Sequence, residues 1–479
     1  MRSRLAFLAE ISHLMALAVD YRVGLAQTGS LVVAELADAF AIDVIPDDGQ
    51  AAGRIFTIGV PVGEDGPLAF DLVAAAGAVG TMYVWRHAPC EGEERLLLAE
   101  IATRIAVAIS SAQLYERAAK VADTLQRALL PERLPSNSGF AFHAAYLPGA
   151  REAIVGGDFY DAFYLPDGRV AFAIGDVAGH GLHAAVVMGE VRQALRAAAI
   201  DPKSPSAVLE RANTILNMRA DPTMVTAIFG IIDPADSAFT YATAGHPPPL
   251  VCMDGQTYVL PTRGIALGVT HSVDAQDWVF PLPPGATLVL YTDGMVEYDR
   301  DIVRGEEVLR KLVCEIAAPK SQDPANELVR TLFASRENAD DAAVLTISAA
   351  AGTSPALTLA FSAIDLALPA SRNALRRYAR EVGLRAEDTH ALLTAVGEAM
   401  ANSVLHAYEP GQIGIVRLQL ELENEHLTAV IEDWGRWRRA PSREHGGRGL
   451  RIMRSLMDRV EIQSEQRHTL VRLSKSVAR

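Results

Sequence analysis

The 479-residue chain shows three successive patterns of hydrophobic and polar positions. In the first pattern, apolar side chains recur every three or four residues, as on one face of a helix. The predicted helices cover residues 5–19, 28–40 and 94–130. The last of them ends before Pro131, because proline cannot continue a helix. Short apolar runs bounded by turn residues predict strands at residues 41–45, 55–60 and 81–85.

Short β runs dominate the second pattern, between residues 140 and 347. The predicted strands cover residues 141–146, 170–176, 225–232, 238–243, 287–291 and 343–347. Two helical segments, residues 182–199 and 204–218, lie among these strands. Many short strands with interleaved helices predict a layered domain in which paired sheets are covered by helices.

A stretch of small residues, 349–354, predicts a flexible linker before the third pattern. Beyond it, strands are predicted at residues 357–361, 413–422 and 426–433, helices at 370–383, 387–407 and 447–457, and further strands at the end of the chain. We therefore expect a multidomain α+β protein. Its expected divisions are a sensor domain at residues 1–118, a linker or switch helix at 119–135, a second domain at 136–349, a linker at 350–355 and a third domain at 356–479.

Composition and charge narrow the function classes. Half of the residues are hydrophobic, so the chain can bury several cores, and the formal net charge of −14 argues against non-specific binding to nucleic acid. The apolar, uncharged stretch at residues 72–85 is shorter than the roughly 20 apolar residues of a membrane span. The three cysteines, Cys90, Cys252 and Cys314, are far apart and form no CxxC motif. We therefore expect no disulfide framework, no structural zinc site, no membrane or nucleic-acid partner and a cytoplasmic location.

Five acidic or glycine-rich motifs carry the chemistry of the second domain. They are Gly-Gly-Asp-Phe-Tyr-Asp from position 156, Gly-Asp-Val-Ala-Gly-His-Gly from 175, Ala-Gly-His-Pro from 244, Tyr-Thr-Asp-Gly from 291 and Asp-Asp from 340. Each Asp-Gly pair alone is typical of a turn. Together, the candidate ligands Asp158, Asp176, Asp293 and Asp340 follow or precede predicted strands, and carboxylates are the ligands that Mg²⁺ and Mn²⁺ prefer. The set predicts a hydrolytic site with two metal ions.

This motif set resembles the PPM-type (PP2C-like) serine phosphatases of the SpoIIE and RsbU class, over residues 120–347. The resemblance implies a PP2C-like αββα sandwich with two Mn²⁺ or Mg²⁺ ions that hydrolyses phosphoserine or phosphothreonine on a small partner protein. It also implies metal ligands, which are Asp158, Asp176, the Val177 carbonyl, Asp293 and Asp340, with Asp341 as the alternative to Asp340.

Two histidines in these motifs have open roles. His180 is either a proton donor to the leaving group or a structural residue, because a metal-activated water makes a further base less necessary. His246 lies in a Gly-His-Pro turn, and we interpret it as structural.

The first region resembles a short GAF domain, since two helices, a small sheet and a long exit helix are typical of an α/β sensor. The exit helix has apolar positions spaced for a packing face or a dimer interface, at Ile101, Ile105, Ile109, Leu114, Val121, Leu125 and Leu129. Our hypothesis is that a homodimer forms through this helix and gates the phosphatase. Equal turnover of a chain that begins near Pro131 would count against this hypothesis.

A second group of candidate functional residues lies in the third domain. Glu398, Asn402 and His406 share one helix face, because they are four residues apart. Asp433 and Gly435 lie at the end of a predicted strand. A glycine cluster that includes Gly447 and Gly449 lies at the start of the next predicted helix, where backbone N–H groups can bind phosphate. The chain has no GxxxxGK[ST] motif, so this is not a P-loop site.

This order of motifs resembles the GHKL (Bergerat) ATPases, an α/β sandwich, and among them the anti-sigma-factor serine kinases, over residues 356–475. The resemblance implies that ATP binds with Mg²⁺. The implied roles are Glu398 as general base, Asn402 as Mg²⁺ ligand, Asp433 as adenine contact, and Gly435, Gly447 and Gly449 as the lining of the nucleotide pocket. The sequence departs from the family's DxGxG motif at Trp437, which stands in place of the second glycine.

The two resemblances together imply a bacterial partner-switching regulator. Its phosphatase would act on a phosphorylated anti-anti-sigma (STAS-type) protein, and its third domain would phosphorylate that class of partner, bind a sigma factor, or do both. The alternative is a phosphatase with a non-catalytic third domain that binds ATP or a sigma factor. Intact Glu398 favours the first interpretation, and Trp437 leaves the second open.

Overall fold

The computed structural model describes most of the chain. The described residues are 4–17, 21–46, 53–61, 66–75, 77–136, 139–149, 156–201, 204–221, 223–233, 237–297, 301–316, 321–334, 340–350, 356–409, 411–436, 448–465 and 467–477. The contacts divide the chain into two compact units, Met1–Val121 and Ala122–Arg479.

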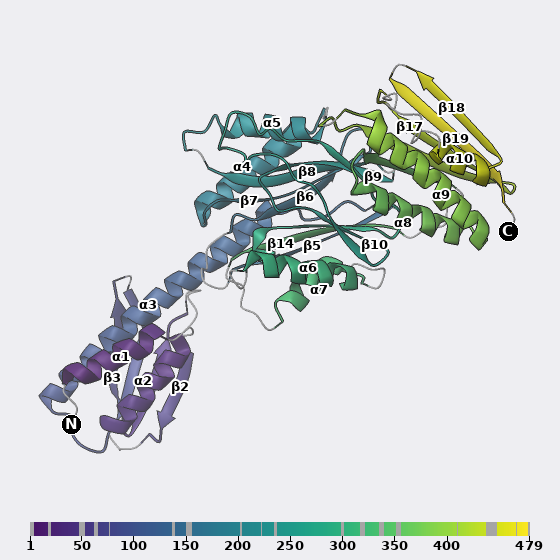
Figure 1. The fold of residues 1–479 in the computed structure, drawn as a ribbon. Helices are drawn as coiled ribbons and strands as arrows, with labels where there is room; N and C mark the ends of the chain where they lie inside the picture. Colours follow the sequence, from purple (N-terminus) through teal and green to yellow (C-terminus); the bar gives the residue numbers. More distant parts are fainter. Residues whose placement is uncertain are drawn as a thin grey trace. The chain divides into compact units, whose positions relative to one another are not determined.

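The first unit is a small antiparallel sheet with helices. Its helices are α1 (Arg4–Leu17), α2 (Tyr21–Glu35) and the beginning of α3 (Gly92–Leu129), and its strands are β1 (Ala39–Val44), β2 (Gly53–Gly59), β3 (Leu68–Ala74) and β4 (Gly77–Trp85). Within the described residues, the strand order is β2-β1-β4-β3 (Figure 1). The core forms where Phe40 and Met82 of the sheet join Ile101 and Ile105 of α3.

Two details of this unit differ from the sequence-based expectation. Helix α2 begins at Tyr21 rather than residue 28, and strand β3 was not predicted. In the structure, strand β3 is largely half-buried or exposed, and Leu72 is its fully buried residue.

Helix α3 also differs from the expectation of no membrane-spanning segment. Among the described residues, Gly92–Arg117 is the one stretch that is long and apolar enough to cross a membrane by length and composition. The expectation rested on uncharged stretches alone, and this stretch contains Glu100 and Arg104. In the structure, its residues Leu98, Ile101 and Ile105 are buried in the core of the first unit.

The second unit begins with two stacked antiparallel sheets. In the described part of the chain, one sheet has the order β11-β10-β13-β14-β5 and the other the order β12-β9-β8-β7-β6. Their strands are β5 (Phe140–Leu147), β6 (Phe159–Tyr164), β7 (Val170–Val177), β8 (Val225–Asp233), β9 (Ala238–Ala244), β10 (Leu250–Met253), β11 (Gln256–Val259), β12 (Trp278–Pro281), β13 (Thr287–Tyr291) and β14 (Ala342–Ala349).

Helices cover both outer faces of the stacked sheets, which gives the PP2C-like αββα arrangement (Figure 1). Helices α4 (Leu182–Ala198) and α5 (Pro205–Leu216) lie on the sheet that contains β7 and β8, and α6 (Ile302–Ile316) and α7 (Pro324–Leu332) lie on the sheet that contains β14 and β5. Strands β7 and β8 are buried on both faces, so they appear in the sequence as continuous apolar runs. The predicted strands and helices of this region were therefore close to the observed ones, whereas β6, β10, β11, β12, α6 and α7 were not predicted.

The remainder of the second unit is a five-stranded antiparallel sheet, as far as the described residues show, with the order β15-β16-β17-β19-β18. Its strands are β15 (Ala356–Ser362), β16 (Ile415–Glu423), β17 (His426–Asp433), β18 (Arg459–Glu465) and β19 (His468–Ser476), and its helices are α8 (Ala367–Glu381), α9 (Ala386–Asn402) and α10 (Arg448–Leu456). Buried and exposed positions alternate along β16, because only one face of the sheet meets the helices. Helix α9 ends at Asn402 and a π-helical turn, Ser403–Ala407, follows it, whereas one continuous helix to residue 407 was predicted.

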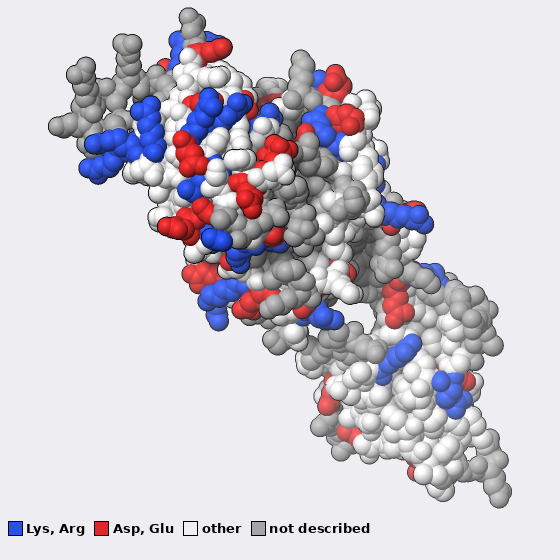
Figure 2. Space-filling view, turned by 90° about the vertical axis from the view of Figure 1, so that its right-hand side faces the viewer, with Lys and Arg blue, Asp and Glu red and all other residues white. Residues whose placement is uncertain are grey.

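The αββα sandwich and this last sheet share buried contacts. Edge strands β12 and β15 lie next to each other, and the Val279 N–H donates to Ser362 Oγ at 2.9 Å. One continuous hydrophobic core includes Phe280 of β12 and Phe361 of β15. Side chains of both charge signs are interspersed over the face drawn in Figure 2.

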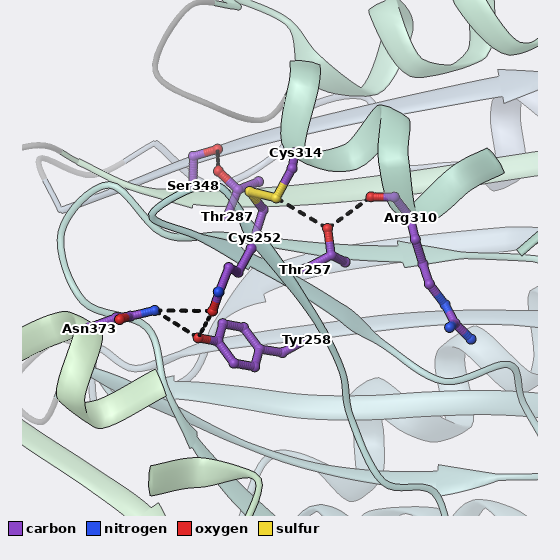
Figure 3. Close-up of a disulfide and its surroundings, with 9 residues drawn as sticks. Cys252, Thr257, Tyr258, Thr287, Arg310, Cys314, Ser348 and Asn373 are labelled. Carbon is purple, nitrogen blue, oxygen red and sulfur yellow. Dashed lines mark hydrogen bonds between the residues drawn. A yellow bond between two sulfur atoms is a disulfide. The ribbon is translucent and has the colours of Figure 1, made fainter. Parts of the chain in front are cut away.

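A disulfide contradicts the expectation drawn from cysteine spacing. Cys252 of β10 and Cys314 of α6 are bonded, with 5.5 Å between their Cα atoms (Figure 3). Their separation of 62 residues in sequence conceals this contact, because it arises only when α6 packs on the sheet.

Candidate metal centre and nucleotide site

Strand register brings the first two aspartates together. Phe159 of β6 pairs with Gly175 of β7, so Asp158 and Asp176 are neighbours at the ends of adjacent antiparallel strands. The backbones are close here, because the Val177 N–H donates to the Gly157 carbonyl at 3.2 Å and a Cβ on Gly157 would lie 2.1 Å from the Val177 oxygen. Glycine is therefore required at position 157, and the Val177 carbonyl lies beside Asp158 and Asp176.

Asp293 joins them from the opposite sheet. It opens a short 3₁₀ turn, Asp293–Met295, directly after β13. Buried Thr292 fixes this turn, because its hydroxyl donates to Asp158 Oδ2 at 2.6 Å and accepts from the Ala343 N–H at 2.8 Å. One carboxylate oxygen each from Asp158, Asp176 and Asp293 lies within 4.8 Å of the others, which makes this the one such candidate metal cluster among the described residues.

The electrostatics of the cluster favour a cation. Burial, followed by the charge of Asp176, holds the pKa of Asp158 well above its usual range. Burial and the charges of Asp293 and Asp340 raise the pKa of Asp176 to about 7. Burial and Asp340 also raise the pKa of Asp293. A divalent cation removes this repulsion between carboxylates, and an all-oxygen donor set suits Mn²⁺ or Mg²⁺.

The Asp340-Asp341 pair, next to Asp293, has two different environments. Asp340 is exposed and acts electrostatically on Asp176 and Asp293, but it is not one of the three clustered carboxylates. Asp341 accepts from the Gly149 N–H at 2.8 Å and also hydrogen-bonds Tyr146. Asp340 accepts from the Asp341 N–H at 2.8 Å, and Asp341 acts on Asp158 and Asp176, so both carboxylates are close enough to influence the cluster.

The sequence interpretation missed two residues at this site. Thr292 links both sheets to Asp158, and Glu297 follows the same motif, with a pKa raised by burial and by Asp293 and Asp340. The polar Thr292 directly after an apolar strand was the available signal. Of the two histidines, His180 is exposed, whereas His246 is buried and hydrogen-bonded on both ring nitrogens.

The second site gathers around the end of α9. Glu398 and Asn402 face the start of α10, because a Cβ on Gly449 would lie 2.9 Å from Glu398 Oε2 and 3.4 Å from Asn402 Nδ2. Glycine at position 449 therefore leaves room for both side chains beside a helix N-terminus, which is a suitable place for phosphate and Mg²⁺.

Asp433 completes this site from the end of β17. It is buried, accepts from Ser403 Oγ at 2.8 Å and accepts from the Gly435 N–H at 3.3 Å. Gly435 is packed against the π-helical turn, since a Cβ there would lie 2.0 Å from the Ala407 oxygen. Glu398, Asn402, Asp433, Gly435 and Gly449 thus lie around one site, and they fit a nucleotide with its Mg²⁺. Gly447 and Trp437 lie outside the described residues.

Family comparisons match both halves of the second unit. The model of Stage II sporulation protein E (SpoIIE) matches residues 166–350, and that of the histidine kinase-like ATPase domain matches residues 361–475.

The individual relatives also match one or the other of these two regions. The phosphoserine phosphatase RsbU of Bacillus subtilis is 28% identical over 181 residues, which cover 37% of this chain and 53% of RsbU. The anti-sigma F factor of Clostridium beijerinckii is 28% identical over 108 residues, which cover 20% of this chain and 76% of that factor. The solved RsbU and RsbW domains of Rv1364c from Mycobacterium tuberculosis are 26% identical, with 72% of this chain and 97% of that chain covered and a TM-score of 0.42.

The chain thus spans about half the length of RsbU, and its relatives differ between its two matched regions. The aspartate cluster lies largely in the first matched region, and the site around Glu398 lies in the second. The chain thus contains a PP2C-like phosphatase domain of the SpoIIE type, followed by a histidine kinase-like ATPase domain that is similar to anti-sigma F factors.

Proposed function

We propose that this protein is a metal-dependent protein serine/threonine phosphatase that acts on a phosphorylated anti-anti-sigma (STAS-type) protein. The observation that carries the proposal is the convergence of Asp158, Asp176 and Asp293 from two sheets onto one site. The names of the relatives, a phosphoserine phosphatase and anti-sigma factors, support a partner-switching pathway.

The roles of the residues follow from their positions. Asp158, Asp176, the Val177 carbonyl and Asp293 would hold two Mn²⁺ or Mg²⁺ ions, and Asp340 would complete the set. When bound, the ions supply a water of lowered pKa as the nucleophile and neutralise charge on the phosphoryl group. Thr292 orients Asp158, and the glycines at 156 and 157 allow the backbone to approach closely.

Phosphate release tests this proposal. The substrate is a STAS protein phosphorylated on serine, incubated with the full chain and Mn²⁺. Asp176→Ala is expected to reduce release by at least a hundredfold, because it removes a shared ligand. Asp167→Ala, in an exposed turn of the same hairpin, is the matched control and should keep full activity. Equal release from wild type and Asp176→Ala would overturn the metal-site assignment.

For the ATPase domain, we infer serine kinase activity on the same class of partner. Glu398 would act as the general base, Asn402 would hold Mg²⁺, and Asp433 would accept a hydrogen bond from the adenine amine. Transfer of radiolabel from ATP to an unphosphorylated STAS protein is expected from the wild type and not from Glu398→Ala. Glu387→Ala, exposed on the first turn of the same helix, should transfer normally.

The second candidate function is a non-catalytic domain that binds ATP or a sigma factor. Trp437, in place of the second motif glycine, favours it. The two candidates differ in one result: a protein that binds ATP with Asp433-dependent affinity and transfers no label has the second function.

The first unit is a GAF-like sensor in this proposal, and the chain is cytoplasmic. Val107, Leu114 and Val121 of α3 are seven residues apart and more than half exposed, so they form an apolar stripe on one helix face. We infer that this stripe is the interface of a homodimer. Leu114→Lys with Val121→Lys should halve the mass in solution measured by light scattering. The control variant, with lysine at the exposed, polar positions Thr103 and Glu116, should keep the mass of the wild type. A monomeric wild type would contradict the inference.

A further inference from the structure

The Cys252–Cys314 pair lies between the phosphatase core and the surface on which the ATPase domain docks. Cys252 is on β10, two residues before the turn residue Asp254, and Cys314 is near the end of α6 (Figure 3). Asp254 and Gly255 both have positive φ, which is the geometry of a tight two-residue hairpin between β10 and β11. The bond therefore attaches this hairpin to α6.

The same hairpin makes the polar contacts to α8 of the ATPase domain. Asp254 forms an ion pair with Arg380 at 3.3 Å. Asn373 Nδ2 donates to the Tyr258 hydroxyl at 2.8 Å, and that hydroxyl donates to Gln256 at 2.9 Å. The hairpin is thus held on one side by the disulfide and contacts the neighbouring domain on the other.

The surroundings of Cys252 and Cys314 are compatible with both the disulfide and the two free thiols. The Thr257 hydroxyl donates to the Arg310 carbonyl at 2.8 Å and lies 3.1 Å from Cys314 Sγ. Thr257 pairs with Cys252 across the β10–β11 ladder, so the backbone holds the two cysteines near each other without the bond. The Cα separation of 5.5 Å is normal for a disulfide, so its closure needs no backbone movement.

A cavity lies next to this cysteine pair. This cavity, of about 420 Å³, lies at the junction of the two domains, with Cys252 and Gly285 on one side and Arg377 and Arg380 on the other. Low-molecular-weight disulfides and thiols exchange with protein thiols when they can reach the sulfur. Arg377 is paired with Glu381 and Arg380 with Asp254 in the same lining, so the cavity offers charges of both signs to a zwitterionic reagent such as glutathione disulfide.

We propose that Cys252 and Cys314 form a reversible dithiol–disulfide couple, and that oxidation tightens the docking of the ATPase domain on the phosphatase domain. In the forward exchange, the two cysteine thiols lose two electrons and two protons, and the low-molecular-weight disulfide gains them to leave as two thiols. Oxidation fixes the β10–β11 hairpin on α6, and the hairpin then holds Asp254 and Tyr258 in place for α8. The inference does not depend on the proposed catalytic activities.

The first experiment tests the chemistry. The full chain is incubated with glutathione disulfide, denatured, alkylated and digested, with dithiothreitol as the reversing agent. We expect a peptide cross-link between Cys252 and Cys314 that dithiothreitol removes, with Cys90 alkylated throughout. A stable glutathione adduct on either cysteine, or a cross-link to Cys90, overturns the proposal.

The second experiment tests the consequence by amide hydrogen exchange of the hairpin and of α8. We expect exchange to be several-fold slower in oxidised wild type than in reduced wild type. Cys314→Ser should exchange at the reduced rate under both conditions, and Cys90→Ser should behave as the wild type. Identical exchange of α8 in cross-linked and reduced wild type overturns the coupling to domain docking. Neither measurement requires turnover, so a failed phosphatase assay would leave both results interpretable.

Discussion

At the scale of single residues, the environment decides what each polar side chain does. Asp158 and Asp341 are both aspartates of the candidate metal motifs, yet Asp158 belongs to the carboxylate cluster and Asp341 forms hydrogen bonds with Gly149 and Tyr146. His246 is a similar case. Its Nε2 is 3.1 Å from the Tyr291 carbonyl, which can only accept, and its Nδ1 is 2.8 Å from Thr226 Oγ1. The ring is therefore neutral, with the proton on Nε2, and burial lowers its pKa to about 3.

This buried neutral histidine predicts a pH-dependent stability. In the unfolded chain His246 takes up a proton near pH 6.5, and in the folded protein it does so only near pH 3, so its contribution is present above pH 6.5 and is lost as the pH falls. Between pH 7 and pH 5, the free energy of unfolding should drop by about 2 kcal/mol from this residue alone. Urea unfolding at both pH values measures this drop.

His246→Gln is the comparison for that experiment, because glutamine can hydrogen-bond both neighbours and does not titrate. The variant should lack the 2 kcal/mol component while the other ionisable groups stay the same. If wild type and variant lost equal stability between pH 7 and pH 5, His246 would have to be protonated in the folded protein.

At the scale of elements, a buried ion pair attaches α4 to β6. The side chain of Asp161 is 1% exposed, and Arg196 donates to both of its oxygens, at 2.6 and 2.7 Å. Arg192 lies 3.2 Å from the same carboxylate, and burial lowers its pKa. Strand β6 follows Asp158 and helix α4 follows the loop after Asp176, so this pair holds two segments of the metal centre in register.

Removing one partner of this pair should be costly. Asp161→Asn leaves two partly buried arginines without a counter-charge, and we expect a loss of about 3 kcal/mol in the free energy of unfolding. Asp167→Asn removes the exposed partner of Arg169 and should change stability little. Chemical denaturation without added metal separates the two variants, and equal costs would mean that Asp161 is solvated.

Alanine substitution at two glycines near the nucleotide site is expected to change the free energy of unfolding by different amounts. A Cβ on Gly435 meets the Ala407 backbone oxygen, which cannot move easily, so Gly435→Ala should cost about 1–3 kcal/mol. A Cβ on Gly449 meets the end of the flexible Glu398 side chain, and alanine favours the helix, so Gly449→Ala should stay within about 1 kcal/mol of wild type. Urea unfolding without ATP is the measurement, and a neutral Gly435→Ala would contradict the packing described here.

At the scale of the whole molecule, the phosphatase and ATPase domains share one core. Phe280 of β12 and Phe361 of β15 belong to the same buried cluster, and the Val279–Ser362 hydrogen bond crosses between the domains. Domains that share buried surface are expected to unfold together.

This shared core predicts that ATP protects both domains. Mg²⁺ and ATP at ten to a hundred times the dissociation constant should raise the unfolding temperature of one joint transition of residues 122–479, because ligand binding stabilises everything that unfolds with the site. Calorimetry measures the unfolding temperature, and hydrogen exchange shows which residues ATP protects. Protection confined to residues 356–477 would show that the domains unfold independently.

The sequence by itself determined the elements that are buried on both faces and the chemistry of the motifs. Strands such as β7 and β8 are continuous apolar runs, and the aspartate and glycine motifs point to metal and nucleotide chemistry without any contact information. Short, half-exposed elements such as β3 and β11 were not predicted, and their place at the edges of sheets became clear only from strand pairing.

Only the tertiary structure decided which distant side chains meet. Strand register placed Asp158 beside Asp176, the stacking of two sheets brought in Asp293, and the packing of α6 joined Cys252 to Cys314. Such contacts depend on strand register and on packing between different segments of the chain, and local patterns of hydrophobicity do not encode that information.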